Sequence, residues 1–266
     1  VQAGLADGGE IPPSPYWKDR IVFPDEEFRA PVNLQGEPRW VKFTILAAPY
    51  DPNIVYFQDC GEYEFHYHFA VDLVTPFIGM TTREFDEATL YSAGRKGILG
   101  AVIMPPDSGW PEPFALSEYG IQFVGRDAYA KEQIAELFEI VKSSIEAEAG
   151  VQAFYFPAYE QAATAEEHKA WFESQGIPIS SASRWMPGNV IYSTGWALGE
   201  LKYFQGTNIA HAYQTGQLEP NDILLTDGVP AEVPFVAGVI SLSPSTPNSH
   251  VSILCRTYGG PFVHVA

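Results

Sequence analysis

The sequence predicts a mixed α+β / α/β fold in two parts, with the change between them near residues 180–189. Three observations lead to this prediction. Apolar strand-like runs recur between residues 40 and 125, a long helical period covers 128–148, and glycines interrupt the strand-like runs after residue 189. We therefore expect an N-terminal mixed α+β domain followed by a second domain whose strands are interrupted by glycines.

The first part is expected to hold an irregular arm at 1–38, rich in Gly, Pro and acidic residues, and an α+β domain of unknown function at 39–183. In 63–74 the residues Tyr63, Phe65, Tyr67 and Phe69 alternate with polar ones, which is typical of a half-buried strand. Strands are predicted at 40–48, 53–59, 63–74, 97–105, 119–125 and 151–159.

Three helices are predicted in the same part. Thr81 and Glu84 form a capping-box pair that opens a helix at 82–92, and apolar residues recur at helical spacing through 128–148. Thr164 with Glu167 predicts a further capped helix that ends at Gln175-Gly176.

The second part follows the turn-rich segment 180–189. In "NVIYSTGWALGELKYF" the glycines stand within strand-like runs, which predicts sharply bent strands or close backbone approach. A short helix ending at Gly216 and strands in "NDILLTD" and "PFVAGVISLS" are expected next. The last helix begins near Ser249, with Val251, Leu254, Cys255 and Tyr258 on one face.

Composition excludes several classes of function. Of the 266 residues 46% are hydrophobic and 14% aromatic, which indicates a folded chain with a core of its own. The net charge of −18 argues against binding of nucleic acid and of anionic membranes, which both require cationic surfaces. No apolar run reaches the roughly 18–20 residues that span a membrane. The two cysteines, Cys60 and Cys255, are too few for a disulfide framework, and Cys255 is expected to be a buried free thiol.

The candidate for chemistry is His250, in "STPNSHVSILCRTYGG". A helix that begins near Ser249 leaves its first amides unpaired and directs its positive dipole end toward the preceding loop. Ser249 or Asn248 can cap this helix, and His250 then stands in its first turn. A histidine at such an anion-binding position can attack a phosphoryl group while the amides hold its oxygens.

The segment "TDGVPAEVPFVAGVISLSPSTPNSHVSILCRTYGGPFV" resembles the phosphohistidine swivelling domain of the phosphoenolpyruvate-utilising enzymes, which include phosphoenolpyruvate synthase, pyruvate phosphate dikinase and the glucan water dikinases. The likeness covers about 189–266. It departs from the family at Ser243-Pro244-Ser245, where many members carry Gly-Gly, and at Cys255, where Ala is usual. The matching positions are Gly195, Ala197, Gly199, Asp227, Pro230, Val236–Leu242, Thr246, Ser249-His250, Arg256 and Gly260-Pro261.

This resemblance implies a β/β/α swivelling domain, cut short after Val263–Ala266, in which His250 is phosphorylated and carries the group between distant sites. It also implies that Thr246, Ser249 and Arg256 bind phosphate, and that Mg²⁺ with ATP or phosphoenolpyruvate loads the histidine. The alternatives are purely structural roles: His250 as a capping or surface residue, Thr246 as a loop residue without a ligand, and Arg256 as a cation that neutralises the end of its helix.

A metal site has weaker support. His66 and His68 would share one face of the predicted strand with Glu64 and Asp72, which is a zinc- or copper-like pair. Alternating polar faces produce such pairs without metal, and no third ligand is fixed by spacing. Hydrolase and nucleotide-loop chemistry find no support, because the chain lacks a Gly-x-Ser-x-Gly elbow and a Gly-Lys-Ser/Thr sequence.

The function predicted from the sequence is the phosphoryl-carrier part of a dikinase-like phosphotransferase. The ATP-grasp and acceptor domains that the reaction needs are not recognised here, so they are expected in the same larger protein or in trans. The alternative is a non-catalytic structural or interaction module, such as a protein of an extracellular assembly, that retains the swivelling-domain fold. The resemblance implies a cytoplasmic protein, whereas a chain that begins with Val1 also suits a fragment or a processed, secreted protein.

Overall fold

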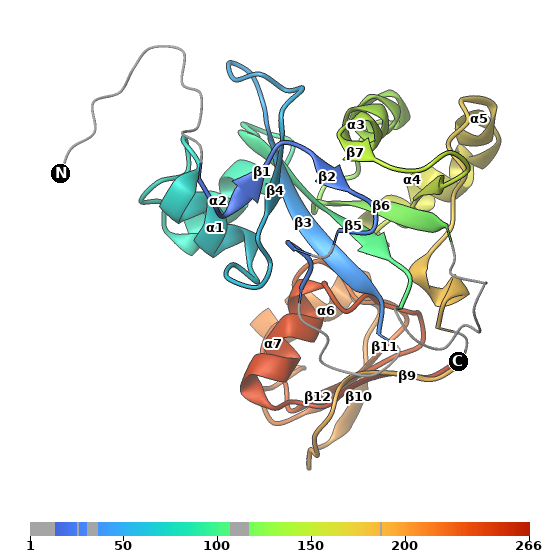
Figure 1. Cartoon of the computed structure of the whole chain (residues 1–266). Helices are drawn as coiled ribbons and strands as arrows, with labels where there is room; N and C mark the ends of the chain where they lie inside the picture. The colour runs from blue at the N-terminus through green and yellow to red at the C-terminus, as the bar shows by residue number, and fades with distance from the viewer. Residues whose placement is uncertain (1–13, 26, 31–36, 107–116, 187) are drawn as a thin grey trace.

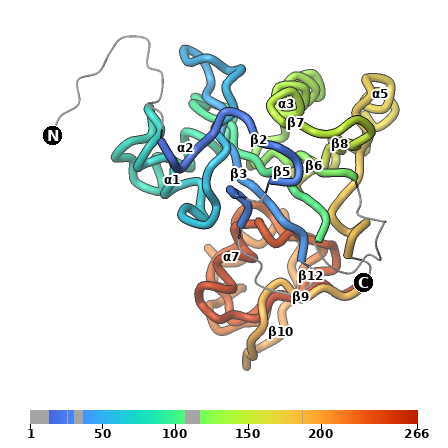
Figure 2. The backbone as a smooth tube through the Cα atoms, viewed as in Figure 1, coloured from blue at the N-terminus to red at the C-terminus, as the bar shows by residue number. Residues whose placement is uncertain are grey.

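The structure is a computed structural model of the chain and describes residues 14–25, 27–30, 37–106, 117–186 and 188–266. Two large sheets dominate it, one built from strands between residues 17 and 155 and the other from strands between 190 and 264. The second sheet and its helices lie below the first sheet in the view of Figure 1, and the chain trace in Figure 2 shows the same stacking. The protein is therefore of the mixed α+β class, as the sequence predicts.

The first sheet has six strands in the order β1-β4-β3-β5-β6-β8. Neighbouring strands run antiparallel except β6 and β8, which are parallel. A short parallel pair, β2 with β7, lies beside it. The strands are β1 (Trp17–Lys18), β2 (Ile21–Val22), β3 (Arg39–Leu46), β4 (Val55–Gln58), β5 (Gly97–Met104), β6 (Glu118–Val124), β7 (Ile145–Glu146) and β8 (Gln152–Tyr155).

One face of the first sheet carries the main apolar core of the protein. Val41, Phe43 and Ile45 of β3 lie on it, each fully buried, and pack in one cluster with Ile134 and Phe138 of the helix α3. Figure 1 shows α3 and α5 on this side of the sheet and α1 and α2 on the other. The helices of this part are α1 (His66–Leu73), α2 (Thr82–Thr89), α3 (Lys131–Ser143), α4 (Ala162–Glu167) and α5 (Lys169–Ser174), with the 3-10 helices η1 (Tyr159–Gln161) and η2 (Ala182–Arg184).

The opposite face combines apolar clusters with buried polar side chains. Helices α1 and α2 cover one apolar cluster on it, and Trp40 belongs to a second. Because side chains alternate along a strand, Lys42 and Thr44 share this face with Trp40. Lys42 pairs in register with Ala101 on β5, which pairs in turn with Gln122 on β6. A row of polar and small residues therefore crosses the sheet under the second part of the chain.

The second sheet has five strands in the order β10-β11-β12-β13-β9, all parallel except β9. Helix α7 begins at Ser249, whose hydroxyl accepts the N–H of Ser252 at 3.1 Å, and ends at Gly259, a left-handed residue with φ 72°. The elements are β9 (Val190–Ser193), β10 (Leu201–Tyr203), η3 (Gly206–Asn208), α6 (Ile209–Gln214), β11 (Ile223–Thr226), β12 (Gly238–Ser241), α7 (His250–Tyr258) and β13 (Phe262–His264).

Helix α7 is buried on two sides rather than on the single face expected. Val251 and Cys255 contribute to the core of the second sheet, while Ile253 packs in a cluster with Trp40 of the first sheet. Tyr258, expected on the apolar face, is 67% exposed. The first sheet covers α7, so the helix has two buried stripes, and a single apolar stripe is the wrong description.

Most predicted elements are confirmed, among them the capping box at Thr81 and Glu84 and the helix that ends before Gly216. The expected close backbone approach is also present, since a Cβ at Gly199 would lie 2.0 Å from the carbonyl oxygen of Asn221. Cys60 and Cys255 are both free thiols; Cys60 is buried, whereas Cys255, which was expected to be buried, is only partly buried. Part of the arm expected at 1–38 forms the strands β1 and β2; residues 1–13, 26 and 31–36 of it lie outside the described residues, as does Pro187 of the predicted linker.

Two further predictions about secondary structure are wrong. The segment 63–74 is not a strand, because His66–Leu73 forms the helix α1. Its helix start carries no local signal, since the N-cap is Phe65 and no side chain caps the first turn. Thr164 does not cap a helix either: α4 starts two residues earlier, after Gln161, and the helical segment breaks at His168.

Candidate functional site

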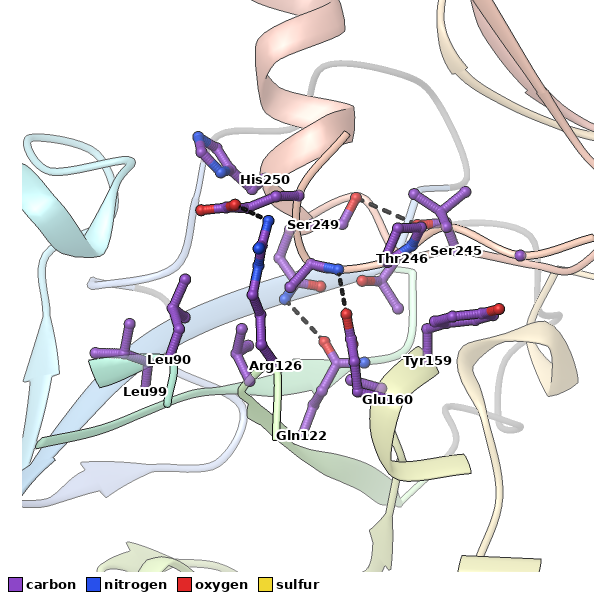
Figure 3. A pocket seen from close by; sticks show the side chains of 18 of the residues that line it. Leu90, Leu99, Gln122, Arg126, Tyr159, Glu160, Ser245, Thr246, Ser249 and His250 are labelled. Carbon is purple, nitrogen blue, oxygen red and sulfur yellow. Dashed lines mark hydrogen bonds and ion pairs between the residues drawn. The ribbon is translucent and has the colours of Figure 1, made fainter. Parts of the chain in front are cut away.

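A cavity of about 1200 Å³ lies between the first sheet with its helices and the loop before α7. The first part contributes β3, β6, α1 and α2, and the second part contributes residues 243–246 and the first turn of α7. Figure 3 shows residues of both parts on the walls of this cavity, with Ser249 and His250 above and Gln122 and Arg126 below. The site is therefore made by residues that lie far apart in the sequence.

His250 occupies the first position of α7 and lines the cavity. His250 is exposed, and partial desolvation of its ring, followed by the positive charge of Lys42, lowers its pKa to about 4. The ring meets Phe65 edge-on at a centroid distance of 5.6 Å. Neither ring nitrogen forms a hydrogen bond or ion pair with a described residue. At neutral pH the imidazole is uncharged and one ring nitrogen has a free lone pair.

The other residues predicted to bind phosphate divide into two groups. Thr246 and Ser249 line the cavity beside His250. The Ser249 hydroxyl is engaged in the helix cap: it donates to Ser252 Oγ at 2.7 Å and accepts from Ser245 Oγ at 3.2 Å. The Thr246 hydroxyl has no hydrogen-bond partner among the described residues.

Arg256 does not line the cavity. Its guanidinium donates to the carbonyl oxygen of Pro247 at 2.9 Å and lies 3.4 Å from Glu37 and 3.5 Å from Glu64. The structure thus brings His250, Thr246 and Ser249 together and places Arg256 in ion pairs that join α7 to the first part of the chain.

His66 and His68 do not form a metal pair. On the helix α1 they stand two positions apart, and side chains at that spacing point to different sides of a helix. His66 Nε2 lies 2.9 Å from the carbonyl oxygen of Gly100, and burial lowers its pKa to about 3. Among the described residues no group of three or more His, Cys, Asp or Glu side chains is placed to hold a metal ion. The strand geometry that suggested the pair is absent.

Several polar residues of the cavity were not singled out from the sequence. Lys42 interrupts the apolar run "WVKFTIL" and Gln122 interrupts "YGIQFVG". A polar residue inside an otherwise apolar strand is the sequence feature that could have identified both as candidate site residues. Asn248 donates to Gln122 Oε1 at 3.2 Å, shown as a dashed line in Figure 3, while its own Oδ1 is buried without a partner among the described residues. Such an unpaired acceptor marks a place where a ligand or water donates a hydrogen bond.

Carboxylates and one arginine form another wall of the cavity. Arg126 pairs with Glu232 of the loop between β11 and β12, and its other nitrogen donates to Tyr91 Oη at 2.9 Å. Burial and the charge of Glu232 raise the pKa of Asp86 to about 6. Glu160 accepts the N–H of Ala231 at 2.7 Å, so this wall also ties the two parts of the chain together.

Comparison of the chain with protein-family models, with curated proteins and with solved structures gave no match. No helix among the described residues has the length and apolar character needed to cross a bilayer. The function must therefore be argued from the site.

Proposed function

We propose that this chain is the phosphoryl-carrier part of a dikinase-like phosphotransferase, in which His250 is transiently phosphorylated. The observation that carries the proposal is the position of His250: an exposed imidazole on the first turn of a helix, open to a large cavity and without a hydrogen bond to any described residue. The resemblance of 189–266 to a phosphohistidine swivelling domain supports the same function. In that interpretation the second sheet with α6 and α7 is the β/β/α unit.

The proposed step forms one bond and breaks another. The lone pair of the free ring nitrogen attacks the phosphorus of the donor and forms an N–P bond. The bond from phosphorus to the leaving group breaks, and its electron pair departs with that group. In this proposal the N–H groups at the start of α7 stabilise the oxygens of the phosphoryl group, apart from that of Ser252, which is donated to Ser249 Oγ.

The donor implied by the resemblance is ATP or phosphoenolpyruvate, with Mg²⁺ to offset the charge of the donor. The described residues provide no cluster of ligands that fits a Mg²⁺ ion. We therefore assign the ion to the donor's own binding domain, an ATP-grasp domain that acts with this chain.

A small chemical donor tests the proposal without partner domains. The chain is incubated with potassium phosphoramidate, from which attack by the imidazole expels ammonia, and is analysed by intact-mass and peptide mass spectrometry at alkaline pH. His211, an exposed histidine on α6, is the internal control. We expect His250 to react faster than His211, with an acid-labile product that is absent in His250→Ala. Reaction at His211 with no reaction at His250 would overturn the proposal.

A second candidate function is homotypic assembly without catalysis. Trp196 and Leu198, which precede the edge strand β10, are 85% and 86% exposed, and Leu201 and Tyr203 on that strand are more than half exposed. An apolar patch beside an edge strand favours pairing between copies. This candidate predicts concentration-dependent sedimentation that Trp196→Ser abolishes; sedimentation as a monomer at all concentrations would exclude it.

A further inference from the structure

Lys42 is a cation in the middle of a buried strand. The residue is 3% exposed, and its Nζ donates to the backbone carbonyl oxygen of Glu64 at 2.7 Å. None of the ion pairs formed by the described residues includes Lys42. A buried ammonium without a carboxylate partner destabilises a folded protein, so its presence calls for an explanation.

The charges near Lys42 do not neutralise it. Glu64 attracts the ammonium and Arg256 repels it. The carboxylate of Glu64 lies 3.5 Å from Arg256, so its charge is already shared. Burial lowers the pKa of Lys42 to about 8, which still leaves the side chain mostly protonated at neutral pH. The rings of Trp40 and Phe65, at 5.1 and 5.7 Å from Nζ, add only cation–π attraction.

The position of Lys42 relates this charge to His250. Both residues line the same cavity, and the ring of Phe65 contacts both of them, with Lys42 Nζ at 5.7 Å and the His250 ring at 5.6 Å from its centroid. Lys42 lowers the pKa of His250 through its charge. The ammonium and the first turn of α7 are therefore on the wall of one cavity, and the Phe65 ring contacts Lys42 and His250.

We propose that Lys42 and the first turn of α7 bind a phosphoryl dianion, so that the first sheet is the station at which the phosphoryl group on His250 is received. The inference rests on the proposed function for the source of that group. A lysine supplies a point charge and two remaining N–H donors, and the helix start supplies amides; together they suit a tetrahedral dianion. The cavity leaves room for the organic part of a phosphate monoester.

The test measures thermal unfolding with and without inorganic phosphate, at matched ionic strength in chloride, for the wild-type chain and two variants. Lys42→Met removes the charge and keeps the apolar stem. Lys202→Met is the matched control, a strand lysine whose Nζ lies 2.9 Å from the carboxylate of Asp222. We expect phosphate to raise the wild-type midpoint and the Lys202→Met midpoint. In Lys42→Met the phosphate-induced shift should fall at least tenfold.

The midpoint without phosphate gives a second readout. If Lys42 serves an anion, Lys42→Met has a higher midpoint than the wild type because a buried unpaired charge is gone. A lower midpoint would show that the hydrogen bond to Glu64 makes Lys42 a structural residue, and would overturn the inference. So would the absence of a phosphate shift in the wild type, or an equal shift in Lys42→Met.

These outcomes separate the inference from the proposed function. If His250 is phosphorylated but the phosphate-induced shift of the unfolding midpoint does not depend on Lys42, the carrier function is supported and the receiving site at Lys42 is refuted. If the shift of the midpoint depends on Lys42 but phosphoramidate does not phosphorylate His250, the cavity binds phosphate and the carrier function is refuted.

Discussion

The two faces of the first sheet are equally buried and chemically different. On β3, Val41 and Phe43 point into an apolar core and are fully buried, whereas Lys42 and Thr44, between and beside them, are 3% and 0% exposed on the other face. A single strand therefore contributes to a core on one side and to a polar cavity wall on the other.

The difference teaches where stability and function are located. The apolar face gains free energy from burial, and its one buried side-chain oxygen without a partner among the described residues is the hydroxyl of Tyr155. The other face keeps polar atoms buried without a partner among the described residues, such as Thr44 Oγ1 and Gln58 Oε1. Such atoms destabilise the fold, whereas Lys42 and Gln122 on the same face line the cavity. Three experiments test this contrast.

The largest effect is expected on the apolar face. Phe43 is fully buried, with the rings of Phe57 and Phe123 each at a centroid distance of 6.0 Å. Phe43→Ala should lower the free energy of unfolding by about 3–5 kcal/mol, since it leaves a cavity in the core. Urea denaturation measures this, with Tyr203→Ala, a half-exposed strand aromatic, as the control. A loss below about 1 kcal/mol would show that this face is not the core.

The polar face should give the sheet its response to acid. Burial and the charge of Lys42 lower the pKa of His66 to about 3. An unfolded chain binds this proton near pH 6.5, so between these values the unfolded state holds a proton that the folded state lacks. The free energy of unfolding therefore falls as the pH falls through this window, by about 2–3 kcal/mol between pH 6.5 and about pH 4.

The His66→Gln variant should remove this part of the pH dependence, because glutamine does not titrate. His211→Gln, on the exposed surface of α6, should leave the pH profile of the wild type unchanged. Denaturation series at several pH values measure both. A His66→Gln profile parallel to that of the wild type would mean that His66 does not contribute to the pH dependence of the free energy of unfolding.

The smallest effect is expected at the start of α7, which covers the polar face. Ser249→Ala removes the helix cap and should lower the free energy of unfolding by about 1 kcal/mol. Thr81→Ala, the cap of α2, provides the comparison in the same denaturation experiment. A loss at Ser249 well above the loss at Thr81 would show that its bonds with Ser245 and Ser252 contribute beyond the cap. No loss would contradict the assigned helix start.

Local chemistry determined much of this protein from the sequence alone. The apolar runs of β3, β5 and β6, the capping box at Thr81 and the Ser249 cap each act within a few residues, and each is present as predicted. The same local pattern placed His250 in the first turn of a helix. Local signals suffice at such positions because the partners of each hydrogen bond are near in the chain.

Only the tertiary structure decided which residues distant in the sequence contact one another. The aromatic residues of 63–74 alternate like a strand, but Tyr67 packs on Phe85 and Phe65 on His250, and these distant contacts favour the helix α1. Arg256 was expected beside phosphate and instead pairs with Glu37 and Glu64. Lys42 and His250 are 208 positions apart by their residue numbers, and no spacing rule relates them. The site depends on burial across two sheets, and burial is a property of the packed chain.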